Sequence, residues 1–170
     1  MNKYLTIIFL VFSIFNSLKA QEEKYIGLFV YNFTKYFDWP IEAKTGDFTI
    51  QVLGHKSVYD ELEKITFEKT IGSQKIVIQH ITSINQINIQ GHILFIGHWQ
   101  TRNIEEINRI TSNKAILKIT EFEGLLQKGS VINFVIREGK IEFELNPENA
   151  LQAGLKVDPR LRELAYKVIK

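Results

Sequence analysis

The sequence offers four histidines as candidates for metal ligation or acid–base chemistry: His55, His80, His92 and His98. No two of them have the i,i+4 spacing that places two imidazoles on one face of a helix, and no acidic residue completes a known ligand pattern. His92 and His98 flank the apolar run 93–96 and are expected at its opposite ends. Core or strand-end histidines with bonded ring nitrogens are therefore favoured over metal ligands.

The carboxylates of Glu142 and Glu144 lie two residues apart, on one face of an expected strand. Such proximity suits an acid–base pair, but an exposed strand face gives the same pattern, and Lys140 beside them indicates surface charge balance. The chain has no cysteine, which excludes disulfides, thiolate metal sites and a catalytic cysteine. It also contains no G-x-S-x-G, P-loop or G-x-G-x-x-G motif. We therefore predict no enzyme activity, no metal and no cofactor, although composition alone leaves a Ser/His/Asp triad open.

Four polar residues are candidates for a ligand pocket: Asn133, Glu144, Asn146 and Lys156. They belong to strand ends or to an expected hairpin, where binding residues tend to lie. Hydrogen bonds that fix the hairpin and cap the helices are the competing interpretation.

The candidate partner surface is an aromatic cluster within segment 31–39. Its candidate contacts are Tyr31, Tyr36, Phe37 and Trp39. Apolar residues at helical spacing predict a helix over 24–37, which Asp38-Trp39-Pro40 ends. Because this helix is apolar nearly all round, it must be covered on more than one side. Either all its aromatics belong to the core, or one face meets a partner or a second copy.

Periodicity and turn signals predict the elements that must position these residues. Strands are expected around 48–53, 75–81, 92–96, 115–120, 131–136 and 140–145; helices at 58–68, 103–111, after Asn146-Pro147 and after Asp158-Pro159. Leu161, Leu164, Ala165 and Val168 are expected to line one face of the last helix. Strands alternate with helices before a hairpin at Glu138-Gly139, which indicates a three-layer α/β domain. Its sheet should be mixed and mostly parallel, ending in an antiparallel hairpin.

Residues 1–20 read as a cleavable signal peptide. Lys3 precedes an uncharged run at 4–15, and Ala20 precedes the favoured cleavage point. The apolar run is too short to span a bilayer, so we expect an exported 21–170 domain without stable membrane insertion. The whole chain carries a net charge of +2, too little to suggest nucleic acid.

Several segments together resemble the YfiR-like family of exported bacterial proteins. The segments 31–40, 48–54 and 92–96 resemble its opening helix, first strand and central strand. Residues 129–146 resemble its hairpin, and segment 150–165 resembles its C-terminal end. The similarity extends in order over nearly all of the expected mature chain.

The resemblance implies a periplasmic regulator that restrains an inner-membrane signalling protein, such as a diguanylate cyclase or a sensor kinase, and thereby affects cyclic-di-GMP signalling and biofilm formation. It also implies a homodimer. The family's best-known member uses disulfides as redox input, which this chain cannot do, and His92 precedes its central strand. A periplasmic small-ligand sensor or binding protein is the alternative function, since α/β sheets offer a crevice at their strand ends. The two functions are compatible if a ligand tunes partner binding.

Overall fold

The computed structural model describes residues 21–169, so the expected signal peptide lies outside the described residues. The N-terminal helix occupies 21–33 and buries Ile26, Val30 and Phe33. It ends before the predicted residue 37 because 34–36 form a turn, which leads into the short strand β1 (Phe37–Asp38). β1 pairs with β9 (Lys156–Val157), so pairing with a distant segment replaces the last helical turn.

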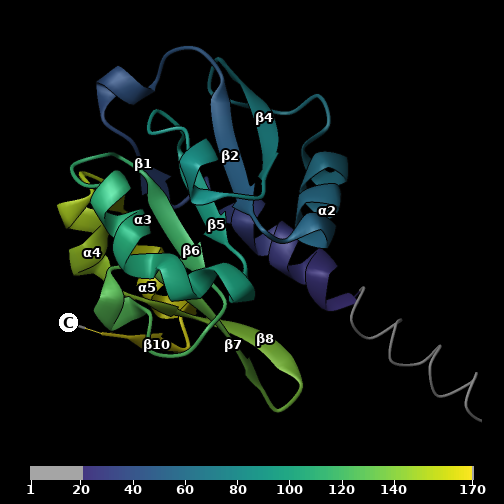
Figure 1. Cartoon of the computed structure of the whole chain (residues 1–170), viewed down its shortest axis with the longest axis vertical. Helices are drawn as coiled ribbons and strands as arrows, with labels where there is room; N and C mark the ends of the chain where they lie inside the picture. The colour runs from purple at the N-terminus through teal and green to yellow at the C-terminus, as the bar shows by residue number, and fades with distance from the viewer. Residues whose placement is uncertain (1–20, 170) are drawn as a thin grey trace, which may run out of the picture.

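The predicted mixed, mostly parallel sheet is confirmed (Figure 1), with the order β10-β8-β7-β6-β5-β2-β4-β3. The strands are β2 (Phe48–Leu53), β3 (Thr70–Ile71), β4 (Gln74–Ile81), β5 (Ile93–Ile96), β6 (Leu117–Thr120), β7 (Ile132–Arg137), β8 (Lys140–Leu145) and β10 (Lys167–Val168). The α-helices after the N-terminal one are α2 (Lys56–Thr66), α3 (Ile104–Ile110), α4 (Pro147–Gln152) and α5 (Pro159–Leu164). Short 3-10 turns are η1 (Ile41–Ala43), η2 (Ile84–Gln86), η3 (His98–Asn103) and η4 (Leu126–Lys128).

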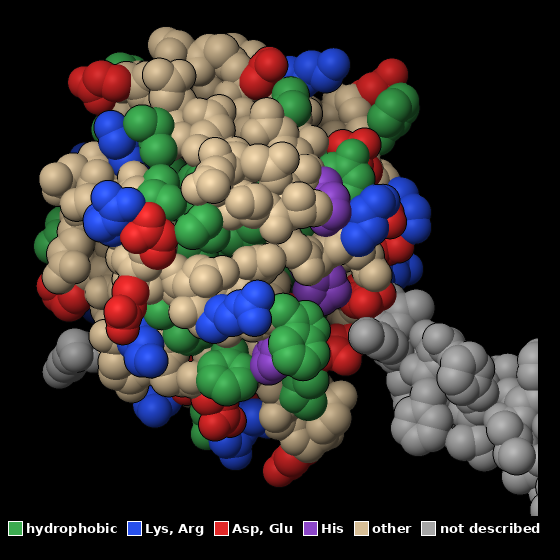
Figure 2. All heavy atoms as spheres, viewed as in Figure 1, with side chains coloured by type: hydrophobic (Ala, Val, Ile, Leu, Met, Phe, Trp, Pro, Cys, Tyr) green, Lys and Arg blue, Asp and Glu red, His purple; other side chains and the backbone are tan. Residues whose placement is uncertain are grey.

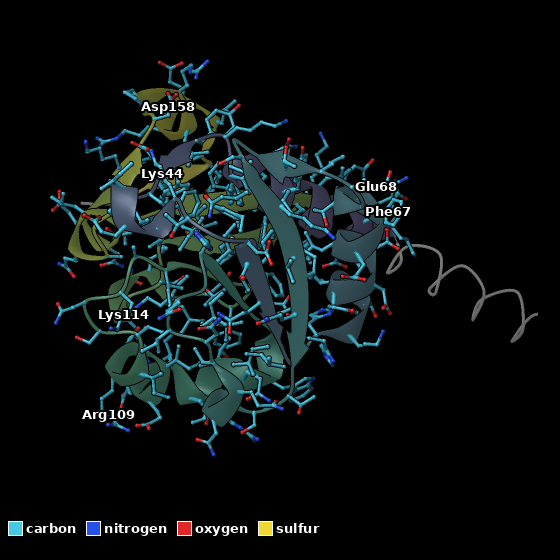
Figure 3. All side chains as sticks on the ribbon, turned by 90° about the horizontal axis from the view of Figure 1, so that it is seen from above. Lys44, Phe67, Glu68, Arg109, Lys114 and Asp158 are labelled. Carbon is cyan, nitrogen blue, oxygen red and sulfur yellow. The ribbon has the colours of Figure 1, made fainter. Side chains whose placement is uncertain are left out.

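Two apolar clusters on opposite sides of the sheet give the predicted three layers. Phe48, Ile50 and Val52 of β2 belong to the larger cluster, which includes the N-terminal helix and α2. Leu53 belongs to the smaller cluster with Ile104 and other residues of the α3 layer. Alternate residues of one strand thus face different helices, as period-2 geometry requires. In Figure 3, Arg109 and Lys114 mark the α3 layer, opposite the N-terminal helix.

The end of the chain differs from the prediction. The hairpin of β7 and β8 is antiparallel as expected, but β10 adds a parallel strand outside β8. The last helix begins after Asp158 as predicted, but its extension to Val168 is wrong: α5 ends at Leu164, whose side chain is exposed, and Val168 belongs to β10. Leu161 is the only residue of α5 that is buried in the core, so a short helix is enough to place the side chain that packs there.

Candidate functional site

A cleft of about 550 Å³ lies where the parallel strands β2, β5, β6 and β7 reach their carboxyl ends. From β2 the chain crosses to β4 on one side and then returns to β5 on the other side. The loops after β2 and β5 therefore diverge at a topological switch point, where open α/β sheets characteristically bind ligands. The volume lies within the usual range of small-molecule pockets.

Each element at this edge contributes a different kind of side chain to the cleft. The loops contribute polar and aromatic groups, whereas the N-terminal helix and the hairpin contribute a mainly apolar side. The loop residues are Gly54, His55, His98, Trp99, Glu121, Phe122 and Glu123; the others are Glu22, Ile26, Phe134, Val135, Ile136 and Ile141.

Glu121 is held at the junction of these loops. Its Oε1 accepts a hydrogen bond from the His98 backbone N–H at 2.6 Å and lies 3.6 Å from Nε2 of His55. Gly97 brings the loops together, since a Cβ there would lie 3.0 Å from both the Leu53 carbonyl oxygen and the His55 Cβ. The arrangement fixes a carboxylate close to an imidazole at the mouth of the cleft.

An aromatic wall stands beside this carboxylate. The His98 ring lies 5.1 Å from the rings of both Trp99 and Phe122, in edge-to-face geometry. Trp99 is 77% exposed and Phe122 is 48% exposed. Figure 2 shows hydrophobic side chains gathered around a histidine in the lower half of the view, with both acidic and basic side chains beside them. The cleft therefore offers aromatic surface and negative charge together.

A second hollow of about 640 Å³ continues from the cleft between the N-terminal helix and the β7–β8 hairpin. We call it the hairpin groove; it is lined by Gln21, Glu22, Tyr25, Phe29, Ile136, Gly139, Lys140 and Ile141. Glu22, Ile136 and Ile141 line both hollows. Tyr25 and Ile136 expose about half or more of their surface, so this face carries apolar area that the described chain leaves open to solvent.

The four predicted ligand residues are not gathered in the cleft. Asn133 is buried, and its Oδ1 accepts hydrogen bonds from the Thr120 hydroxyl and the Phe122 N–H. Asn146 caps α4: its Oδ1 accepts hydrogen bonds from the N–H groups of Glu148 and Asn149. These contacts match the competing interpretation, in which such residues fix the hairpin and cap the helices.

The other two predicted ligand residues lie apart from each other. Glu144 accepts a hydrogen bond from Asn133 Nδ2 and lines a small hollow with Tyr166 and Lys167. Lys156 is exposed on β9, paired in register with Asp38. The hollow that Glu144 lines does not include Lys156, so a common ligand-binding role for the set remains a prediction.

The predicted partner residues divide by burial. Phe37 and Trp39 are buried in the larger core cluster, where Trp39 donates its indole N–H to the Ala115 carbonyl. Tyr31 and Tyr36 are half-buried. Lys69 Nζ lies 4.4 Å from the Tyr31 ring centroid. Any partner contact at this cluster therefore falls mainly to the two tyrosines.

Two titratable side chains outside the cleft have pKa values that burial lowers. His92 is 3% exposed; its Nδ1 accepts the Thr49 N–H at 3.1 Å, and Nε2 lies 2.7 Å from the Ala43 carbonyl oxygen. Burial lowers the pKa of His92, opposed in part by the Ala43 hydrogen bond. Burial likewise lowers the pKa of Lys118 to about 8, while its Nζ donates to Asn108 Oδ1. Neither group faces a carboxylate in these contacts.

Two kinds of feature are absent from residues 21–169. No group of three or more His, Asp or Glu side chains there is arranged to hold a metal ion. In the same part of the chain, no helix combines the length and apolarity needed to cross a bilayer.

Comparison with known proteins decides the family. The model of the YfiR/HmsC-like family matches residues 24–166, which is most of the chain. The chain belongs to the YfiR/HmsC-like family. The resemblance noted from the opening helix, the central strand and the hairpin is thus confirmed. No curated protein matches the chain in sequence.

One solved structure supports the fold of this YfiR/HmsC-like chain. A conserved domain protein from Vibrio cholerae O1 biovar El Tor superimposes with a TM-score of 0.54 at 11% identity, covering 71% of this chain and 54% of that one. The chain thus spans about half the length of that relative. A second structure, an ABC domain in complex with L-Trp from Streptococcus pneumoniae, gives a TM-score of 0.48 at 11% identity, covering 72% and 55% of the two chains.

The cleft residues of this YfiR/HmsC-like chain were missed as a set by sequence reasoning. His55 and His98 were expected to be core or strand-end residues rather than metal ligands, and Trp99, Glu121 and Phe122 were not among the candidate residues. A usable signal existed, because each follows an expected parallel strand and the ends of parallel strands meet at one edge. The order of the strands in the sheet decides which strand ends become neighbours, and this order cannot be derived from the periodicity of the sequence.

Proposed function

We propose that the protein is an exported regulator that binds and restrains an inner-membrane signalling protein, either a diguanylate cyclase or a sensor kinase. Membership of the YfiR/HmsC-like family carries the proposal. Regulation through binding requires a surface, not reacting groups, and the exposed apolar hairpin groove supplies one. The proposal places the protein in the periplasm, with residues 1–20 removed on export.

The proposed contact surface centres on Tyr25 and Ile136, which face the hairpin groove from the helix and from β7. An apolar segment from the periplasmic part of the signalling protein is the proposed occupant, because aromatic and aliphatic side chains dominate the centres of protein interfaces. Binding to one arrangement of the partner would hold it inactive. Tyr31 and Tyr36 remain the predicted contacts of a second region, which a homodimer would use.

The experiment measures binding to the purified periplasmic segments of the membrane diguanylate cyclases and sensor kinases of the same bacterium. Calorimetry should detect a complex with the unchanged protein. Tyr25→Glu and Ile136→Glu should each weaken it by more than about tenfold, because a charge would be buried without a partner.

Phe67→Glu is the matched control. Phe67 is 73% exposed at the end of α2, where Figure 3 shows it pointing away from the body of the molecule. Equal binding by all variants would remove the hairpin groove from the proposal. Failure of the unchanged protein to bind any such segment would count against the regulatory function itself.

A second function, small-ligand binding, is favoured by the cleft at the switch point. The cleft and the hairpin groove share Glu22, Ile136 and Ile141, so an occupant of one changes the surface available to the other. A ligand could therefore tune partner binding, provided that its affinity differs between the free and the partner-bound protein.

A further inference from the structure

We propose that the cleft at the carboxyl ends of the parallel strands binds an organic cation: a protonated amine on an apolar body. The inference rests on the second function proposed above, ligand binding in this cleft, and names the chemical class of the ligand.

Charge is the first argument. Glu22, Glu121 and Glu123 line the cleft, whereas no lysine or arginine occurs among its described lining residues. Glu121 is fixed in place by the His98 N–H and lies beside His55. Carboxylates that line a cleft with apolar walls focus a negative potential into it and raise the local concentration of cations.

The aromatic wall is the second and independent argument. Trp99 and Phe122 flank His98 and leave much of their ring surface open to the solvent. Ring faces carry negative electrostatic potential, and tryptophan attracts a cation most strongly of the three aromatic residues. An aromatic wall beside carboxylates is the arrangement that distinguishes an ammonium group from a neutral or anionic one.

The third argument concerns the rest of the ligand. Ile26, Phe134 and Ile136 give the cleft an apolar side, opposite in character to the carboxylates. A small inorganic cation would gain nothing from this side, and no metal-binding group was found among the described residues. A molecule with a charged end and an apolar end uses both.

The N-terminus of α2 is a nearby feature that favours an anion, because helix N-termini carry partial positive charge. The helix begins at Lys56, after His55. The residues of its first turn, Lys56, Ser57 and Val58, do not line the cleft, and Glu121 lies beside His55 at this terminus. The carboxylates therefore determine the sign of the charge that a ligand in the cleft would meet.

The test compares three probes of matched size: 2-phenylethylammonium, 3-phenylpropionate and 2-phenylethanol. Binding to protein isolated from the bacterial envelope is followed by calorimetry and by tryptophan fluorescence at about pH 8, where ordinary histidines are neutral. Only two tryptophans exist, and Trp39 is buried, so a ligand in the cleft should alter the emission of Trp99. The ammonium probe should bind at millimolar concentrations or below, at least about tenfold more tightly than either other probe.

Variants locate the site. Glu121→Gln and Glu123→Gln should each weaken the ammonium probe by roughly three- to tenfold while leaving the alcohol unaffected. Trp99→Leu should weaken it by a similar factor, and Trp99→Phe should restore part of the loss. Glu163→Gln, an exposed substitution on α5, is the control. Circular dichroism confirms that each variant is folded.

The outcomes separate the inference from the function beneath it. Equal or tighter binding of the anion or the alcohol would overturn the cation but keep ligand binding in the cleft. Binding of the ammonium probe that is indifferent to the Glu121, Glu123 and Trp99 changes would place it elsewhere and overturn the inference. Failure of all three probes at millimolar concentrations would overturn both the inference and the second function.

Discussion

His92 illustrates how a side chain with catalytic potential can serve the architecture. Its ring stacks on Phe48 with 4.3 Å between centroids, and its nitrogens join β2 to η1 through Thr49 and Ala43. The prediction of a core or strand-end histidine is confirmed for this residue. Because the neutral ring with a proton on Nε2 satisfies both contacts, a second proton would remove the acceptor that Thr49 needs.

The pH dependence of stability should reflect this geometry. Burial holds the pKa of folded His92 below its ordinary value of 6.5, whereas the unfolded chain keeps that value. As the pH falls through 6.5, the unfolded chain takes up the proton first, so the free energy of unfolding decreases until the folded pKa is reached. His92→Gln should show a smaller loss of melting temperature than the unchanged protein between about pH 7.5 and 5.5. If the melting temperatures of the two proteins decreased equally over this pH range, the pH dependence of stability would belong to groups other than His92.

The helices stabilise the fold through close contact with one another as well as by burying their apolar faces. Gly27 of the N-terminal helix is buried, and a Cβ there would lie 3.2 Å from Ile65 Cδ1 and 3.4 Å from Glu61 Cβ of α2. Glycine thus sets the approach of these two helices. Their common position on one face of the sheet fixes where Glu22 and Tyr25 stand at the cleft and the groove.

Gly27→Val should therefore destabilise the fold by about 1–3 kcal/mol, because its methyl groups overpack this contact. Gly27→Ala adds one carbon against the movable end of Ile65 and gains about 0.5–1 kcal/mol of helix preference, so it should be close to neutral. Urea unfolding of both variants provides the comparison. A valine variant as stable as the alanine variant would mean that the helices separate without cost.

Elements with a local signal were well predicted, and elements made by distant pairing were not. The alternation of apolar and polar residues correctly predicted β2, and β8 has its predicted bounds. Asn146 and Asp158 each cap the start of a helix, as expected. β1 and β10 have two residues each and exist because β9 and β8 lie beside them. No property of their own sequences distinguishes such strands from helix ends.

At the scale of the whole molecule, the layers were predictable but the cleft was not. Segment periodicity reveals which residues face a helix layer, since each strand carries its own pattern. The cleft depends on β2 standing between β4 and β5, a property of strand order. The predicted cover on several sides of the apolar N-terminal helix comes mostly from the protein's own core, and a partner on the remaining surface stays a prediction.

Export should determine the first residue of the mature protein. The arrangement of charged, apolar and small residues in segment 1–20 predicts cleavage before Gln21. Intact-mass measurement of the protein from the bacterial envelope should give a chain that starts at or near Gln21. Full-length protein confined to the cytoplasm would contradict export and, with it, the proposed meeting with a periplasmic partner.

The two-residue strands at the sheet borders also affect how copies can associate. β3 and β10 are the outermost strands, and each pairs with only two residues of its longer neighbour, β4 or β8. Most of the outer border of β4 and of β8 therefore has no strand beside it in residues 21–169. Open borders invite intermolecular β-pairing and fibre formation, and charged side chains discourage both. Lys140 and Lys167 place charges on the β8 side of the sheet. Copies that crowding links strand to strand should therefore join at these two borders, and more readily along β4 than along β8.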